Sequence, residues 1–231
     1  MTREILMVIG FISLLLNLLL VFFFFKAYRY QRSFIALCLP LGFLFLAISY
    51  VFLFAHFFYP YVPGLSSPLM WLRVVTQTLG YTLIASSYLL SRKNNRTSKF
   101  SFSTLSVWSI VSVISLFGLL LVIDPIGTLS IYSINGIFTA ANLALLTYIL
   151  YFIITNLEMK QGSVYGLVSA PIAFAFLWLG QFSFLIWKFD GGTASLYSSE
   201  ITRVISLILF IRIYYLVSRG CSRPIDINEE K

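Results

Sequence analysis

The chain has 231 residues, of which 59% are hydrophobic and only 10% are charged, and its formal net charge is +8. A water-soluble domain carries about a quarter charged residues, so this composition excludes one and predicts a protein embedded in a lipid bilayer. The polar stretches are too short to fold separately, and we expect residues 1–231 to form a single integral membrane domain.

Long apolar segments predict a bundle of seven membrane-spanning helices, each of which needs about 20 residues. Backbone amides must be paired inside hydrocarbon, and these segments are too long and too uniformly apolar for barrel strands. The first segment exceeds the length of a signal peptide's apolar region and precedes no small-residue cleavage pattern, so we expect it to be retained. The expected helices are Glu4–Phe25, Phe34–Phe58, Leu69–Leu90, Leu105–Ile123, Ile131–Thr155, Tyr165–Trp187 and Leu196–Ser218.

The distribution of basic residues orients the predicted bundle. Lysines and arginines gather after the first and third helices and in the C-terminal tail, whereas the opposite loops hold almost none. The positive-inside rule then predicts an N-terminus outside and a cytoplasmic C-terminus, in a multi-pass protein of the cell membrane. Because an anionic lipid leaflet accounts for the positive charge, no nucleic-acid partner is expected. The basic residues concerned are Lys26, Arg29, Arg32, Arg92, Lys93, Arg96, Lys99, Arg219, Arg223 and Lys231.

Two similar stretches indicate an internal repeat. Pro40-Leu-Gly-Phe-Leu-Phe-Leu46 and Pro171-Ile-Ala-Phe-Ala-Phe-Leu177 share a proline, two phenylalanines and a leucine at an offset of 131 residues (171 minus 40). Because the copies are four helices apart, they share one orientation, which predicts a 3+1+3 parallel pseudo-repeat. Its parts are repeat 1 (about 4–90), a connector helix (105–123), repeat 2 (about 131–218) and a cytoplasmic tail (219–231). The flanking helices add two further matches, Asn17 with Asn142 and Arg73 with Arg203.

In this architecture the chain resembles the SWEET and PQ-loop transporters and, with the same topology, the microbial rhodopsins. It also looks a little like the seven-helix sensory modules found ahead of histidine kinases. The chain departs from each of these patterns, since it has no Pro-Gln pair and carries no kinase segment. A rhodopsin needs a lysine in its last helix to hold retinal, and the basic residue near that place is Arg212, which does not form the Schiff base. Retinal is therefore not expected.

The candidate ligand-binding residues lie on the third, sixth and seventh helices. Arg73, Gln77 and Tyr81 recur at four-residue spacing and so share one helix face, while Glu200 and Arg203 are spaced for a local ion pair. An outward-facing pocket with two arginines would suit an anionic ligand group. Alternatively, both arginines extend to the outer headgroups. The candidate residues are Arg73, Gln77, Tyr81, Gln181, Glu200 and Arg203.

Other polar residues inside the predicted helices allow two interpretations. They either line a polar cavity at mid-membrane or join helices through ordinary hydrogen bonds. Arg212 lies on the opposite face of its helix from Arg203 and is expected to extend towards the cytoplasm, with a gating or partner contact as the alternative. The other polar residues are Asn17, Asn135, Thr139, Asn142, Trp178, Gln181 and Lys188.

No motif of a metalloprotease, serine hydrolase or phosphate-binding loop is present, and intramembrane carboxylate pairs are absent, so we expect no enzyme, metal site or cofactor. The favoured function is a receptor or sensor that binds an anionic or small polar ligand from outside and acts through a cytoplasmic or membrane partner. The alternatives are a small-solute transporter with its site between the repeats, or a non-catalytic subunit of a membrane complex. Pro40 and Pro171 motivate the transporter, because a proline inside a helix kinks it.

Overall fold

The computed structural model describes residues 2–31, 34–58, 66–93, 131–158, 169–190 and 192–220. The predicted all-α class is confirmed for this part of the chain, and the predicted connector helix Leu105–Ile123 lies outside it. The six helices are α1 (Thr2–Gln31), α2 (Phe34–Phe58), α3 (Ser66–Lys93), α5 (Ile131–Glu158), α7 (Ser169–Asp190) and α8 (Thr193–Gly220).

The helices match the predicted segments but mostly extend beyond them. The bounds of α2 are those predicted, Phe34–Phe58, whereas α1 continues from Phe25 to Gln31 through a basic stretch that was expected to be a loop. The length of an apolar run matches the thickness of the hydrocarbon layer, and the helix can continue beyond that layer. The stretch after Phe25 contains no glycine or proline, so its backbone hydrogen bonding continues past the apolar run.

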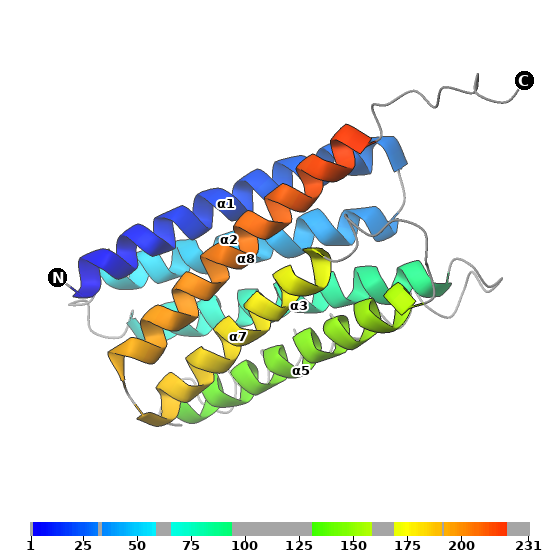
Figure 1. The fold of residues 1–231 in the computed structure, drawn as a ribbon. Helices are drawn as coiled ribbons and strands as arrows, with labels where there is room; N and C mark the ends of the chain where they lie inside the picture. The colour runs from blue at the N-terminus through cyan, green and yellow to red at the C-terminus, as the bar shows by residue number, and fades with distance from the viewer. Residues whose placement is uncertain are drawn as a thin grey trace, which may run out of the picture.

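The six helices pack as a closed ring. Going round it, the order is α1, α2, α3, α5, α7 and α8, and α8 packs back against α1. Figure 1 shows that α1, α3, α5 and α8 run in one direction and α2 and α7 in the other. The beginning of α1 and the end of α8 therefore lie at opposite ends of the bundle. Side chains from helices that are not neighbours in the ring can meet in its interior.

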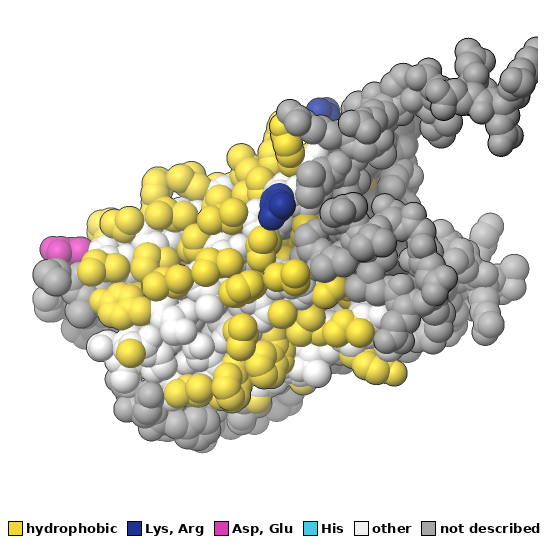
Figure 2. Space-filling model, in the orientation of Figure 1, with side chains coloured by type: hydrophobic (Ala, Val, Ile, Leu, Met, Phe, Trp, Pro, Cys, Tyr) yellow, Lys and Arg dark blue, Asp and Glu magenta, His cyan; other side chains and the backbone are white. Residues whose placement is uncertain are grey.

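The outside of the ring suits a lipid environment. Five helices, α1, α2, α5, α7 and α8, are long and apolar enough to cross a membrane. On α1 many of the large apolar side chains, such as Val8 and Phe22, are exposed, and they are spread along its length. Figure 2 shows hydrophobic side chains over most of the described surface in view, with few charged groups. A water-facing surface would carry many more charges, so we interpret this face as lipid-facing.

The remaining helix, α3, is the most polar and the most enclosed. Between Arg73 and Ser87 every residue except Leu79 is buried. Four of its threonines and serines donate to carbonyl oxygens of the preceding turn, as when Thr82 donates to the Thr78 carbonyl oxygen at 2.8 Å. Local hydrogen bonds of this kind satisfy the hydroxyl groups inside the helix, so that α3 can carry polar residues where it is buried. That α3 also crosses the membrane stays a prediction.

Aromatic packing from both predicted repeat segments forms the centre of the core. Phe43 of α2 and Phe174 of α7, which match in the sequence repeat, are both fully buried. Each packs edge-on against Phe210 of α8, with ring centroids 5.5 Å and 4.8 Å away respectively. Edge-to-face pairs at these distances contribute about 0.5–1.5 kcal/mol beyond the area they bury. The core thereby connects α2, α7 and α8.

Two glycines allow α2 and α3 to cross in close contact. A Cβ atom on Gly42 would lie 2.9 Å from the Gly80 carbonyl oxygen, and one on Gly80 would lie 2.8 Å from the Gly42 carbonyl oxygen. Small residues at helix crossings are how membrane bundles obtain tight packing without a hydrophobic driving force between helices. Nearby, Pro40 lies inside α2, whereas Pro171 lies in the first described turn of α7.

Candidate functional site

Three helices converge on the carboxylate of Glu200. Arg73 of α3 donates from Nη2 to Oε1 at 3.2 Å, and Arg203 of α8 donates from Nη1 to the same oxygen at 3.2 Å. The hydroxyl of Tyr50 on α2 donates to the other oxygen, Oε2, at 3.3 Å. We call Arg73, Glu200 and Arg203 the arginine–glutamate cluster. It confirms the predicted Glu200–Arg203 ion pair and adds Arg73, which is distant in sequence.

All three charged groups of the cluster are withdrawn from the surface. The exposed fractions are 6% for Arg73, 3% for Glu200 and 2% for Arg203. The alternative in which both arginines extend to the outer headgroups is therefore wrong. Its physical basis was the cost of a charge in hydrocarbon, and here a shared carboxylate offsets that cost for both guanidinium groups. Burial also means that salt in solution screens these interactions only weakly.

The ring of Phe184 on α7 provides a second contact for both arginines. The Cζ atom of Arg73 lies 5.7 Å from the ring centroid and that of Arg203 lies 5.3 Å away. A cation attracted to an aromatic face gains about 2 kcal/mol when desolvated. One carboxylate and one aromatic ring thus hold two guanidinium groups of like charge close together.

A second buried hydrogen bond joins α7 to α3 beside the cluster. Gln181 donates from Nε2 to the hydroxyl oxygen of Tyr81 at 3.0 Å, and both side chains are almost completely buried. The phenol of Tyr81 also lies in the neighbourhood of Arg203. The predicted residues of three helices are therefore brought together by the fold. Gln77, the remaining candidate, is buried on α3 between Arg73 and Tyr81.

Several buried polar atoms around the cluster have no hydrogen-bond partner in the described structure. On Arg203 these are the donors Nε and Nη2, and on Gln181 the acceptor Oε1. The hydroxyl oxygens of Ser13 and Ser199 are in the same condition. Buried donors without acceptors are costly, and a guanidinium group more so than a neutral group. The cluster therefore has hydrogen-bonding capacity that its own side chains do not use.

Gly180 fixes how closely α8 approaches α7 at the cluster. A Cβ atom on Gly180 would lie 2.9 Å from Cγ of Arg203 and 3.1 Å from the carbonyl oxygen of Ser199. Only a glycine leaves this space to the arginine stem. The residue next in the chain is Gln181, so this contact sets the positions of both residues relative to α3.

Sequence reasoning missed Tyr50 and Phe184. Both lie within apolar helices that carry many aromatic residues, so nothing distinguishes them from core residues before the helices are placed. One weak indication of Tyr50 was present in the sequence: the residue before it, Ser49, is polar and interrupts the apolar run of α2. Side chains such as these can be recognised as part of the site only when the packing of the helices places them next to charged groups of other helices.

The other polar residues of the helices lie elsewhere. Trp178 donates from Nε1 to Oγ1 of Thr147 at 2.9 Å, which joins α7 to α5 as the hydrogen-bonding alternative predicted. Asn17 donates to the Ser13 carbonyl oxygen at 2.7 Å, and the Oδ1 atoms of Asn17 and Asn142 are buried without a partner. The side chains of Asn135 and Lys188 lie outside the described part of the chain.

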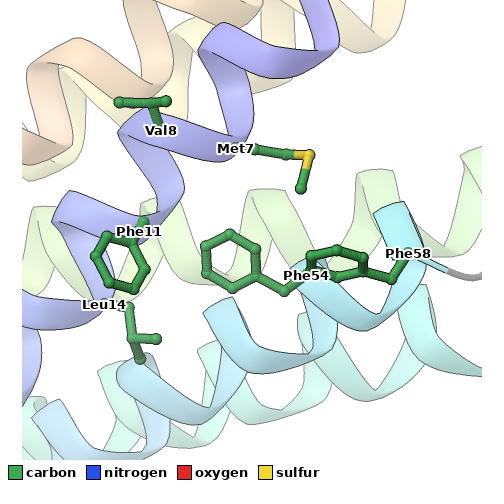
Figure 3. A pocket seen from close by; sticks show the side chains of 6 residues that line it. All are labelled: Met7, Val8, Phe11, Leu14, Phe54 and Phe58. Carbon is green, nitrogen blue, oxygen red and sulfur yellow. The ribbon is translucent and has the colours of Figure 1, made fainter.

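Two surface grooves are lined by described residues, and neither is lined by Arg73, Glu200 or Arg203. The larger, of about 440 Å³, lies between α1 and α2 and is lined only by apolar side chains (Figure 3). The second, of about 420 Å³, lies between α1 and α8 and includes Arg212. No group of side chains suited to a metal ion occurs among the described residues. The charged side chains of the arginine–glutamate cluster are thus buried and line neither of these two grooves.

Comparisons with protein-family models, with curated proteins and with solved structures find no match for this chain. The resemblances to SWEET and PQ-loop transporters, rhodopsins and sensory modules accordingly stay predictions. The buried cluster and its surroundings are what distinguish this bundle chemically from a purely apolar one.

Proposed function

We propose that the chain is a receptor- or sensor-like membrane protein that binds a small anionic ligand, of the carboxylate or oxyanion class, at the arginine–glutamate cluster. The ligand enters from the outer side, and the change in helix packing is passed to a membrane or cytoplasmic partner. The observation that supports this most directly is the charge of the cluster. Two guanidinium groups share a single carboxylate inside the ring.

The balance of charge favours an anion. With two positive groups against one negative group, the buried cluster is left with an excess positive charge. A ligand carboxylate would neutralise that charge and accept hydrogen bonds from Nε and Nη2 of Arg203, for which the described residues provide no acceptor within hydrogen-bonding geometry. Guanidinium groups bind carboxylates through two parallel N–H donors, and Nε with Nη2 forms such a pair of donors.

The depth of the cluster supports entry from the predicted outer end. Arg73 lies seven residues from the beginning of α3 at Ser66, and Glu200 lies seven residues from the beginning of α8 at Thr193. At a rise of 1.5 Å per residue, both lie about 10 Å inside the bundle. The same end contains the beginning of α1, which the positive-inside rule assigns to the outside.

A transporter is the second candidate, and the order of the ring favours it. Exchanging α1 with α5, α2 with α7 and α3 with α8 turns the observed set of helix contacts into itself. This is what the 3+1+3 pseudo-repeat, with an axis along the membrane normal, requires. The cluster would then join the last helices of the two repeats, α3 and α8. The prolines give less support, since Pro40 and Pro171 occupy different positions in their helices.

Ligand binding is tested by thermal unfolding of the purified protein in a neutral detergent. Sodium acetate, glutamate, sulfate and phosphate are titrated at constant ionic strength, with glucose as an uncharged comparison. An anion that binds only the folded state stabilises it by about 2.7 kcal/mol at a hundredfold excess over its Kd. We expect one class of anion to raise the unfolding temperature of the wild type and not of Arg203→Met.

Arg29→Met provides the control, because Arg29 is an exposed arginine of α1 whose guanidinium carbon lies 5.8 Å from the Phe25 ring and away from the cluster. Equal stabilisation of Arg203→Met and the wild type by every anion would contradict the proposed site. Uptake of the same anion into proteoliposomes separates the two candidates. Uptake that is lost in both Arg73→Met and Arg203→Met would favour the transporter over the receptor.

A further inference from the structure

Arg212 of α8 is an arginine within an apolar span that does not belong to the arginine–glutamate cluster. It lies within the apolar span Thr193–Tyr215 of α8, three residues before the end of that span, and its side chain is exposed. The acidic side chains that the structure describes are those of Glu4 and Glu200. Both lie towards the opposite end of the bundle, and neither of these two pairs with Arg212. An exposed guanidinium so near the end of an apolar span extends its charge to the headgroup level, where lipid phosphate groups lie.

The surroundings of Arg212 form a groove between α1 and α8. The groove has a volume of about 420 Å³ and is otherwise apolar or aromatic. Phe23 of α1 stacks on Tyr214 of α8 with ring centroids 4.6 Å apart and an angle of 3° between the planes, and this pair joins the two walls. The lining residues are Phe23, Ile208, Ile211, Arg212, Tyr214 and Tyr215.

We propose that this groove binds one anionic phospholipid from the leaflet that surrounds the end of α8. Its phosphate contacts the Arg212 guanidinium, and one acyl chain lies along Ile208 towards the middle of the membrane. Guanidinium groups pair with phosphate through two N–H donors, and the tyrosines occupy the interfacial level where aromatic residues collect. This inference is independent of the function proposed for the arginine–glutamate cluster.

A second basic residue favours a lipid of net negative charge over a zwitterionic one. Since Phe23 stacks on Tyr214, these residues lie at the same depth in the membrane. Lys26 follows Phe23 by three residues on the same side of α1 and is exposed. Each basic group near an anionic headgroup contributes about 1 kcal/mol, which corresponds to about fivefold in affinity.

Native mass spectrometry of the full chain tests the proposal. The protein is released from a neutral detergent after equilibration with equal amounts of phosphatidylglycerol and phosphatidylcholine of identical acyl chains. We expect wild-type protein to retain one phosphatidylglycerol in preference to phosphatidylcholine by about fivefold or more. Arg212→Gln should lose this preference, whereas Arg29→Gln, which removes an arginine of α1 that does not line the groove, should keep it.

A pair of tryptophan variants tests the groove without changing any charge. Ile208 lines the groove and is 52% exposed, whereas Ile201 lies on the same helix outside it and is 48% exposed. Ile208→Trp should reduce the retained lipid, and Ile201→Trp should not. Circular dichroism and size-exclusion chromatography establish that each variant is folded.

Three outcomes would overturn the proposal. The first is a preference for phosphatidylglycerol that survives Arg212→Gln, and the second is an equal loss in Arg29→Gln, which would assign the preference to overall charge. The third is a dimer without bound lipid whose proportion falls in Ile208→Trp, because the groove would then be an interface between two copies of this chain.

Discussion

Arg73 of α3 and Arg203 of α8 each donate to the same carboxylate oxygen of Glu200, both at 3.2 Å. These helices are not neighbours in the ring of packed helices, so the contact crosses its interior. Tyr50 of α2 completes the set through the other carboxylate oxygen. One acidic side chain therefore joins α2, α3 and α8.

Neutralising Glu200 should be the most damaging single change in the cluster. Glu200→Gln leaves two buried guanidinium groups with no negative charge between them, and we expect a loss of about 3–5 kcal/mol in the free energy of unfolding. Arg73→Met is the informative comparison, because it leaves one arginine paired with Glu200 and should cost less. Chemical unfolding in detergent micelles, followed by circular dichroism, measures both. A smaller loss for Glu200→Gln than for Arg73→Met would contradict the charge balance described here.

Removing the Tyr81 hydroxyl should leave Gln181 without its partner on α3. We expect Tyr81→Phe to destabilise the fold by about 1–3 kcal/mol, the cost of a buried donor left unpaired. Tyr151, an exposed tyrosine of α5, supplies the control variant Tyr151→Phe, which should be neutral. Thermal unfolding of the two variants side by side measures the difference. Equal unfolding temperatures would show that the hydrogen bond between α7 and α3 adds nothing to stability.

The crossing of α2 and α3 should not accept a methyl group. Gly42→Ala places a Cβ atom 2.9 Å from the Gly80 carbonyl oxygen, so the helices must separate, at a cost of about 1–3 kcal/mol. At Gly136 of α5 a Cβ atom would meet none of the described residues within 4 Å. Gly136→Ala should therefore be neutral or stabilise by about 0.5–1 kcal/mol through helix propensity. A similar loss in the free energy of unfolding for both variants, relative to the wild type, would refute this distinction.

Gly180→Ala should disturb the cluster specifically. The added methyl group would meet Cγ of Arg203 at 2.9 Å and push the guanidinium away from Glu200. We expect a loss of about 1–3 kcal/mol in stability together with weaker anion binding in the thermal titration proposed above. Gly42→Ala is the matched control, since it strains a different helix crossing and should leave anion binding unchanged. Anion affinity that is retained in Gly180→Ala would separate this glycine from the site.

The two ends of the chain should lie on opposite sides of the membrane. The beginning of α1 and the end of α8 are at opposite ends of the bundle, and the positive-inside rule places the former outside. Epitope tags fused to each terminus can be compared by antibody labelling of intact and permeabilised cells. The N-terminal tag should be labelled in intact cells and the C-terminal tag only after permeabilisation. The reverse pattern would place the arginine–glutamate cluster near the cytoplasmic side.

Helix positions could be predicted well because each membrane helix is marked in the sequence by a long apolar run. The bounds Phe34–Phe58 agree with the structure, and five of the other predicted segments fall largely within described helices, whereas Leu105–Ile123 lies outside the described residues. The ends were harder, as at α1, because basic residues such as Lys26 and Arg29 remain helical outside the hydrocarbon. An apolar run shows which part of a helix lies in hydrocarbon. The helix itself ends where its backbone hydrogen bonding stops.

The site could be predicted in part. Spacing along one helix suffices for the Glu200–Arg203 pair, since residues three apart on a helix are neighbours. That Arg73 shares the same carboxylate, and that Tyr50 and Phe184 surround the charges, depends on which helix faces meet. Helix rotation is set by packing, as at Gly180 and Arg203, and no local pattern encodes it.

The sequence by itself determined the solvent of this protein, because 59% hydrophobic and 10% charged residues leave a lipid environment as the one in which the chain can fold. It also determined that the described helices would form, since an unpaired backbone amide is too costly in hydrocarbon. Only the tertiary structure decided that Arg73 and Arg203 turn inward. An arginine reaches either headgroups or a buried carboxylate, and the choice depends on whether the fold brings Glu200 within hydrogen-bonding distance of both.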